Sequence, residues 1–177
     1  MNTTTFDFED GNGPVPAHQH SNGGGWVADT ATVADTAYIG PDARVYDYAQ
    51  VLNYAWVHGN AHVYDNARVY GYAWACGNAH VFGYAWVHGN AHVFDNARVS
   101  GNAYVCGNAH VFDNARVLGN ATVHGNAWVY GNAHVFGKAR VFDYARVYGD
   151  AWVYGKARVF DTVRVDGCAL VNETNRL

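Results

Sequence analysis

The chain has 177 residues, a formal net charge of −4 and three cysteines. Its length suits one domain or one solenoid, and its slight negative charge argues against extended binding to nucleic acid. The cysteines Cys76, Cys106 and Cys168 are odd in number and widely spaced, which excludes a disulfide framework and predicts a reducing, cytoplasmic location. No apolar run is long enough to span a membrane, and the polar start MNTTTFDFED predicts no secretory signal.

Residues 1–25 do not share the pattern of the rest of the chain. They include the stretch GNGPVPAHQHSNGGG, which is rich in glycine and has no apolar period. We expect this segment to be a cap or tail that covers the open edge of the structure that follows.

Residues 26–171 repeat a six-residue unit, A-x-V-x-[G/D]-[N/Y/K], without an insertion. Ala recurs at every sixth position from Ala31 to Ala157, and Val or Ile follows two residues later except at Ala75. Alternation within A-x-V is the period of a β-strand, so Ala and Val lie on one side and the intervening residue on the other. Gly or Asp followed by Asn then supplies a turn, because these residues tolerate positive φ.

A strand and a corner in every repeat cannot form hairpins, because the same face always points inward. Three such sides predict a triangular coil of about 18 residues, and stacking gives an all-β parallel β-helix of about eight coils. Residues 172–177 form a short C-terminal tail. Asn60, Asn78, Asn96, Asn114 and Asn132 recur once per predicted coil and are predicted to stack as a ladder of amides at one corner.

The repeat resembles the hexapeptide repeat of left-handed parallel β-helices, the fold of bacterial acyltransferases and γ-class carbonic anhydrases. This resemblance implies a left-handed coil and a homotrimer. The commoner hexapeptide repeat of this family places Gly directly after the aliphatic residue. In this chain Gly or Asp comes one residue later, which resembles the GNARV-type repeats of uncharacterised acyltransferase-like and phage-type proteins. A phage-type origin would imply action on a host signal or a host protein.

Any binding or catalytic side chain must lie at an outward position. The outward positions that recur once per coil form three columns, one on each side of the triangular coil. The first column is Trp26, Arg44, His62, His80, Arg98, Arg116, His134 and Trp152. The second is Thr32, Gln50, Arg68, Trp86, Tyr104, Thr122, Arg140 and Arg158. The third is Tyr38, Trp56, Trp74, His92, His110, Trp128, Arg146 and Arg164.

Like charges on neighbouring strands destabilise a sheet, so the first column needs an offsetting negative charge. Three sources are open: the corner Asp residues, acidic groups of a second subunit, or an anionic ligand. We expect ligand binding by Arg44, His62, His80, Arg98, Arg116 and His134, meeting Trp56, Trp74, His92, His110 and Trp128 of a neighbouring subunit. His62 and His80 are expected to strengthen anion binding below about pH 6.5, where imidazole gains charge.

The exposed aromatic residues predict a homo-oligomer, with a small anionic or nucleotide-like molecule or a protein as its partner. His88, Cys106 and His124 occupy equivalent positions of successive coils and would be candidate zinc ligands, but a straight column converges poorly on one ion.

The resemblance also implies acyl transfer with a His general base in a subunit cleft. No loop leaves the coil and no His pairs with a carboxylate at a defined spacing, so we assign no catalytic residue, metal or cofactor. A non-enzymatic binding or structural protein is the favoured interpretation, and an active or degenerate CoA-dependent acyltransferase is the alternative.

Overall fold

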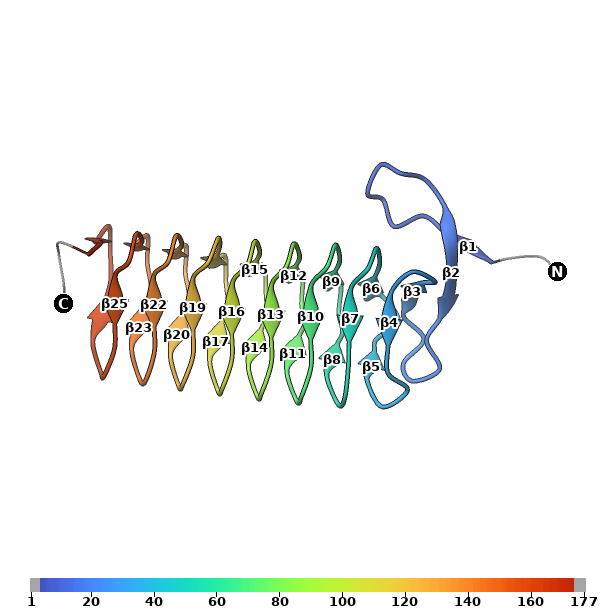
Figure 1. The fold of residues 1–177 in the computed structure, drawn as a ribbon, viewed down its shortest axis with the longest axis horizontal. Coiled ribbons are helices and arrows are strands. Elements are labelled where there is room, and N and C mark those ends of the chain that lie inside the picture. Colours follow the sequence, from blue (N-terminus) through green and yellow to red (C-terminus); the bar gives the residue numbers. More distant parts are fainter. Residues whose placement is uncertain (1–3, 174–177) are drawn as a thin grey trace.

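The chain forms three β-sheets that are wound around one narrow core, in a computed structural model that describes residues 4–173. The coils stack along one axis, and an N-terminal hairpin crosses one end of the stack (Figure 1). Among the described residues all regular elements are strands, and none forms a helix that could cross a membrane. Most of the predicted C-terminal tail, residues 174–177, lies outside the described part of the chain.

Most strands contain two residues, the outward residue and the inward Val of one repeat. The first sheet contains β1 (Thr5–Phe6), β2 (Val15–Gln19), β3 (Trp26–Ala28), β6 (Arg44–Val45), β9 (His62–Val63), β12 (His80–Val81), β15 (Arg98–Val99), β18 (Arg116–Val117), β21 (His134–Val135), β24 (Trp152–Val153) and β27 (Leu170–Val171). The second contains β4 (Thr32–Val33), β7 (Gln50–Val51), β10 (Arg68–Val69), β13 (Trp86–Val87), β16 (Tyr104–Val105), β19 (Thr122–Val123), β22 (Arg140–Val141) and β25 (Arg158–Val159). The third contains β5 (Tyr38–Ile39), β8 (Trp56–Val57), β11 (Trp74–Ala75), β14 (His92–Val93), β17 (His110–Val111), β20 (Trp128–Val129), β23 (Arg146–Val147) and β26 (Arg164–Val165).

Every parallel pair of strands joins equivalent positions of successive coils. Arg98 lies opposite Arg116, for example, and Trp74 opposite Trp56. The predicted coil length and the all-β parallel solenoid are therefore confirmed. The register leaves no freedom to slip, because a shift of one residue would turn every Val outward.

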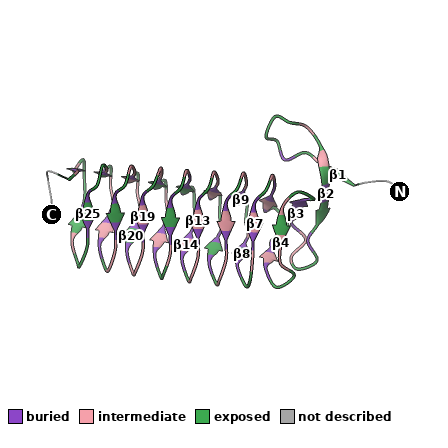
Figure 2. Ribbon diagram, viewed as in Figure 1, coloured by how far each residue is buried: buried purple, intermediate pink, exposed green. Residues whose placement is uncertain are grey.

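The core consists almost entirely of Ala and Val, as predicted. From Ala37 to Val153 every inward Ala, Val or Ile has an exposed fraction of 0%. Trp56 and Trp74 are 42% and 36% exposed, which confirms the predicted orientation of the strands (Figure 2).

From residue 47 to residue 167 the corners share one backbone conformation, in which one residue per corner has positive φ. Gly occupies most of these positions, and Asp47, Asn53, Asp65, Asp95, Asp113, Asp143 and Asp161 occupy others with φ between 56° and 59°. The predicted amide ladder forms beside them: each Asn donates to the next, from Asn60 to Asn132, and Asn132 donates to Asp150.

The N-terminal hairpin covers the edge of the first sheet. β2 pairs antiparallel with β3, placing Ala17 opposite Ala28. Phe8 is 2% exposed and stacks on Tyr46, and Phe6 stacks on Trp26 at 4.3 Å between ring centroids. This second, smaller core fixes the hairpin over the first coils of that sheet.

Candidate functional site

The six ligand-binding candidates of the first predicted column, Arg44 to His134, lie on consecutive strands of one sheet. Arg44 on β6 pairs with His62 on β9, and the register continues in the same way as far as His134 on β21. Neighbouring strands in a sheet are about 4.8 Å apart, so these side chains form one continuous stripe.

Arg44 is held by the N-terminal hairpin. Its Nη1 atom lies 3.2 Å from a carboxylate oxygen of Glu9 and donates a hydrogen bond to the carbonyl oxygen of Phe8. The Arg44 guanidinium keeps the pKa of the Glu9 carboxyl below its usual value. The hairpin therefore supplies the charge that offsets the first arginine of the column.

The histidines of the column are held in their neutral form. Burial lowers the pKa of His62 to about 4, with smaller contributions from repulsion by His80, when it is protonated, and by Arg44. Burial and Arg98 lower the pKa of His80, and burial and Arg116 lower that of His134. The expectation that His62 gains charge just below pH 6.5 is therefore wrong, because desolvation opposes the charged imidazole.

The corner carboxylates bond to the backbone of the next coil. Asp65 accepts a hydrogen bond from the N–H of Gly83 at 2.9 Å, and Asp113 accepts one from the N–H of Gly131 at 3.0 Å. Asp47, Asp95 and Asp143 do the same for Asp65, Asp113 and Asp161. The corner Asp residues thus satisfy donors of the stack and do not pair with the arginines.

Arg98 and Arg116 remain without an offsetting partner in the described chain. Within residues 4–173 the ion pairs of arginine and lysine are Arg44–Glu9 and Lys156–Glu173, and His18 Nδ1 lies 2.9 Å from a carboxylate oxygen of Asp29. Other arginines lie over aromatic rings, as Arg68 does over Trp86 and Arg146 over Trp128. Arg98 and Arg116 are exposed, adjacent and in register, and within the described residues they contact neither a carboxylate nor a ring in this way.

The third predicted column lies on the third sheet, and its rings from Trp56 to Trp128 contact one another in a continuous line. Trp56 stacks on Trp74 at 5.4 Å and Trp74 on His92 at 5.0 Å. The rings of His92 and His110 are 4.9 Å apart between centroids, and those of His110 and Trp128 are 5.3 Å apart, both with tilted planes. Within one chain this column and the first lie on different sheets, so they do not form one site together.

The comparisons with known proteins agree with this architecture. A family model described as "YdcK Beta solenoid repeat" matches residues 61–77 and 109–125, which read AHVYDNARVYGYAWACG and AHVFDNARVLGNATVHG. The chain is a β-solenoid repeat protein. The comparison with curated proteins gave no match.

The three candidate zinc ligands of this β-solenoid do not form a metal site. His88 stacks on Tyr70 at 4.8 Å and His124 on Phe142 at 5.0 Å, while burial raises the pKa of the Cys106 thiol. No three His, Cys, Asp or Glu side chains between residues 4 and 173 are grouped so as to hold a metal ion.

A groove lies on the second sheet of the solenoid and was not predicted from the sequence. It has a volume of about 460 Å³ and is lined by Tyr48, Gln50, Asn66, Arg68, Tyr84, Trp86, Asn102 and Tyr104. The signal in the sequence is the alternation of Tyr and Asn at the corner positions 48, 66, 84 and 102. The predicted columns contain only the outward residues between Ala and Val, so they did not include these corner residues.

Proposed function

We propose that this β-solenoid is a non-enzymatic binding protein that holds an anionic ligand at Arg98 and Arg116. The observation that supports the proposal is the pair of exposed guanidinium groups on β15 and β18, with no carboxylate of the described chain beside them. Two like charges in register destabilise the sheet by themselves. A phosphate or carboxylate group between them would accept charge-assisted hydrogen bonds from both.

The neighbouring side chains suit this role. His80 and His134 flank the arginine pair in the column. Their neutral imidazoles add hydrogen-bonding groups without adding to the repulsion. An anion at Arg98 and Arg116 would also offset the positive charges that help to lower the pKa of both histidines.

We further propose that the solenoid works as a homotrimer, with the ring stack of one subunit beside the arginine pair of the next. The third sheet exposes Trp56, Trp74 and Trp128 in one line. Exposed aromatic columns of this size are typical of surfaces that contact other chains. A ligand between subunits would then meet the arginines on one side and indole rings on the other.

The test is calorimetric titration of the protein with pyrophosphate, nucleotides and CoA, with the molar mass measured by light scattering on the same sample. We expect Arg98→Ala and Arg116→Ala each to lower the affinity by about tenfold to one-hundredfold, which corresponds to about 1.5–3 kcal/mol. Binding should also raise the pKa values of His80 and His134, as NMR of their ring protons would show.

Arg140→Ala is the matched control, because Arg140 is an exposed arginine on another sheet that lies over Phe142. It should leave the affinity unchanged within about twofold, since about 0.4 kcal/mol is a factor of two. If no anion binds, or if Arg140→Ala weakens binding as much as Arg98→Ala does, the arginine pair is not the site. A monomer at micromolar concentration would contradict the trimer.

A further inference from the structure

The groove on the second sheet is built differently from the rest of the solenoid surface. Four consecutive coils each contribute a corner residue and the outward residue two positions later, giving Tyr48 and Gln50, Asn66 and Arg68, Tyr84 and Trp86, Asn102 and Tyr104. Three strand spacings span about 14 Å. A volume of about 460 Å³ is in the range of sites that bind small molecules.

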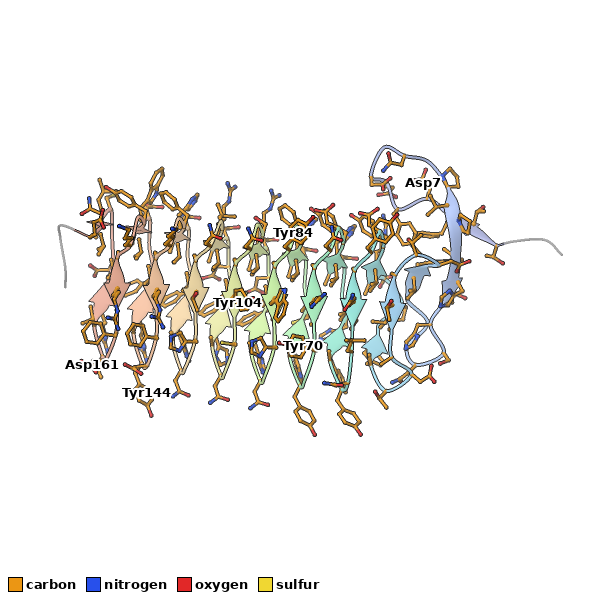
Figure 3. The ribbon with its side chains drawn as sticks, in the orientation of Figure 1. Asp7, Tyr70, Tyr84, Tyr104, Tyr144 and Asp161 are labelled. Atoms are coloured by element: carbon orange, nitrogen blue, oxygen red, sulfur yellow. The ribbon has the colours of Figure 1, made fainter. Side chains whose placement is uncertain are left out.

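Two tyrosines form the walls of this groove. Tyr48 and Tyr84 are 66% and 61% exposed, and the coil between them carries the short Asn66 at the same corner. The backbones of the two tyrosines are therefore two strand spacings, about 10 Å, apart. Figure 3 shows Tyr84 at the upper corner of its coil and Tyr104 on the face of the sheet.

Another exposed tyrosine pair of the solenoid shows the contrast. Tyr54 and Tyr72 lie on adjacent coils, at the next corner, and stack directly on each other at 5.5 Å between centroids. That pair leaves no gap. The gap between Tyr48 and Tyr84 follows from the alternation of Tyr with Asn.

The floor of the groove carries one positive charge and several amides. Arg68 lies over the ring of Trp86 at 4.9 Å, and Trp86 contacts Tyr104 at 5.2 Å between centroids. Arg68 forms no ion pair within the described residues. The nearby corner carboxylates of Asp47 and Asp65 accept backbone N–H groups, and the described residues that line the groove include no acid.

We infer that this groove binds an acidic saccharide. A flat aromatic ring between two tyrosines needs them about 7–8 Å apart, twice the contact distance between carbon atoms. A separation of about 10 Å, two strand spacings, suits a thicker, puckered sugar ring whose C–H faces stack on the tyrosines. Gln50, Asn66 and Asn102 offer donors and acceptors to hydroxyl groups, and Arg68 can pair with a carboxylate of the sugar.

The site is tested by calorimetric titration with an oligogalacturonate of three or four sugars and with a neutral glucose oligomer of the same length. The acidic oligomer should bind saturably and more tightly than the neutral one. Arg68→Gln should weaken binding of the acidic oligomer by about tenfold or more and remove the preference for it. Tyr84→Ala should weaken binding of both oligomers, because it removes one wall.

Tyr72→Ala is the matched control, since Tyr72 is also 61% exposed at a corner but lies outside the groove. It should leave binding unchanged. Repeating the titrations in the Arg98→Ala variant removes the contribution of the anion site on the first sheet, so that the effects of Arg68→Gln and Tyr84→Ala report on this groove alone. All four substitutions are at the surface, and thermal unfolding checks that each variant is folded. The inference is overturned if neither oligomer binds, if Tyr72→Ala abolishes binding as Tyr84→Ala does, or if only a carboxylate-bearing peptide binds there.

Discussion

At the scale of single residues, the corner aspartates hold the coils together by bonding to the backbone. Asp65 has φ of 58° and accepts the N–H of Gly83 from the next coil. Asp65→Ala keeps the unfavourable backbone conformation and removes the acceptor, so we expect it to lower the free energy of unfolding by about 1–3 kcal/mol. Asp65→Gly should cost less, because glycine relieves the backbone, and Asp65→Asn should be nearly neutral.

Urea unfolding of the three Asp65 variants would measure these differences. Asn keeps a side-chain acceptor but has no charge, so it distinguishes the hydrogen bond from charge pairing with an arginine. A loss for Asp65→Asn as large as that for Asp65→Ala would contradict the hydrogen-bond explanation.

The same residues show what sequence reasoning could and could not reach. That Asp65 stands at a corner, and that Val63 and Val81 face inward, follows from the period of two and from the turn residues alone. That the Asp65 carboxylate bonds a backbone N–H depends on a side-chain direction, which periodicity does not specify. Likewise the outward position of His62 was predictable, but its lowered pKa depends on burial by its neighbours.

At the scale of elements, the N-terminal hairpin is the part that the repeat did not predict in detail. Residues 1–25 have no period, so nothing in them specifies that Phe8 stacks on Tyr46 or that Glu9 pairs with Arg44. These contacts join segments that lie far apart in the sequence, where periodicity gives no information. The general expectation of a cap came only from the need of an open sheet edge for cover.

The hairpin should depend on Phe8, which is 2% exposed. Phe8→Ala should cost about 3–5 kcal/mol of local stability, because it leaves a cavity between the hairpin and Tyr46. Amides at the junction of β2 and β3 should then exchange with solvent faster, and light scattering should show aggregation through the uncovered edge. Phe160→Ala, at a ring that is 38% exposed near the other end, serves as the control. Unchanged exchange at Val27 and Ala28 in Phe8→Ala would show that the hairpin is held by other contacts.

At the scale of the whole molecule, stability rests on a uniform core whose outward positions carry several histidines with lowered pKa values. Burial is the first cause that lowers the pKa of His62, His80, His88, His92, His124 and His134. In the unfolded chain these groups titrate near pH 6.5. Between that pH and the lower folded-state pKa values, the unfolded chain binds more protons than the folded one, so stability falls as the pH falls.

The thermal midpoint should therefore be constant between about pH 7 and pH 8 and decrease as the pH is lowered from about 6.5 towards 4. His62 has a pKa of about 4 and lies among Arg44, Glu9, His80 and Tyr46. Allowing for the partial exposure of His62, we expect its titration to lower the free energy of unfolding by about 1 kcal/mol, which corresponds to about 2–4 °C in the midpoint.

His62→Phe keeps a ring to stack on His80, which is 5.0 Å away, and removes the titration. Calorimetry at pH 7 and pH 5 should then show a smaller decrease in the variant than in the wild type, whereas an equal decrease would mean that His62 takes no part in the acid sensitivity.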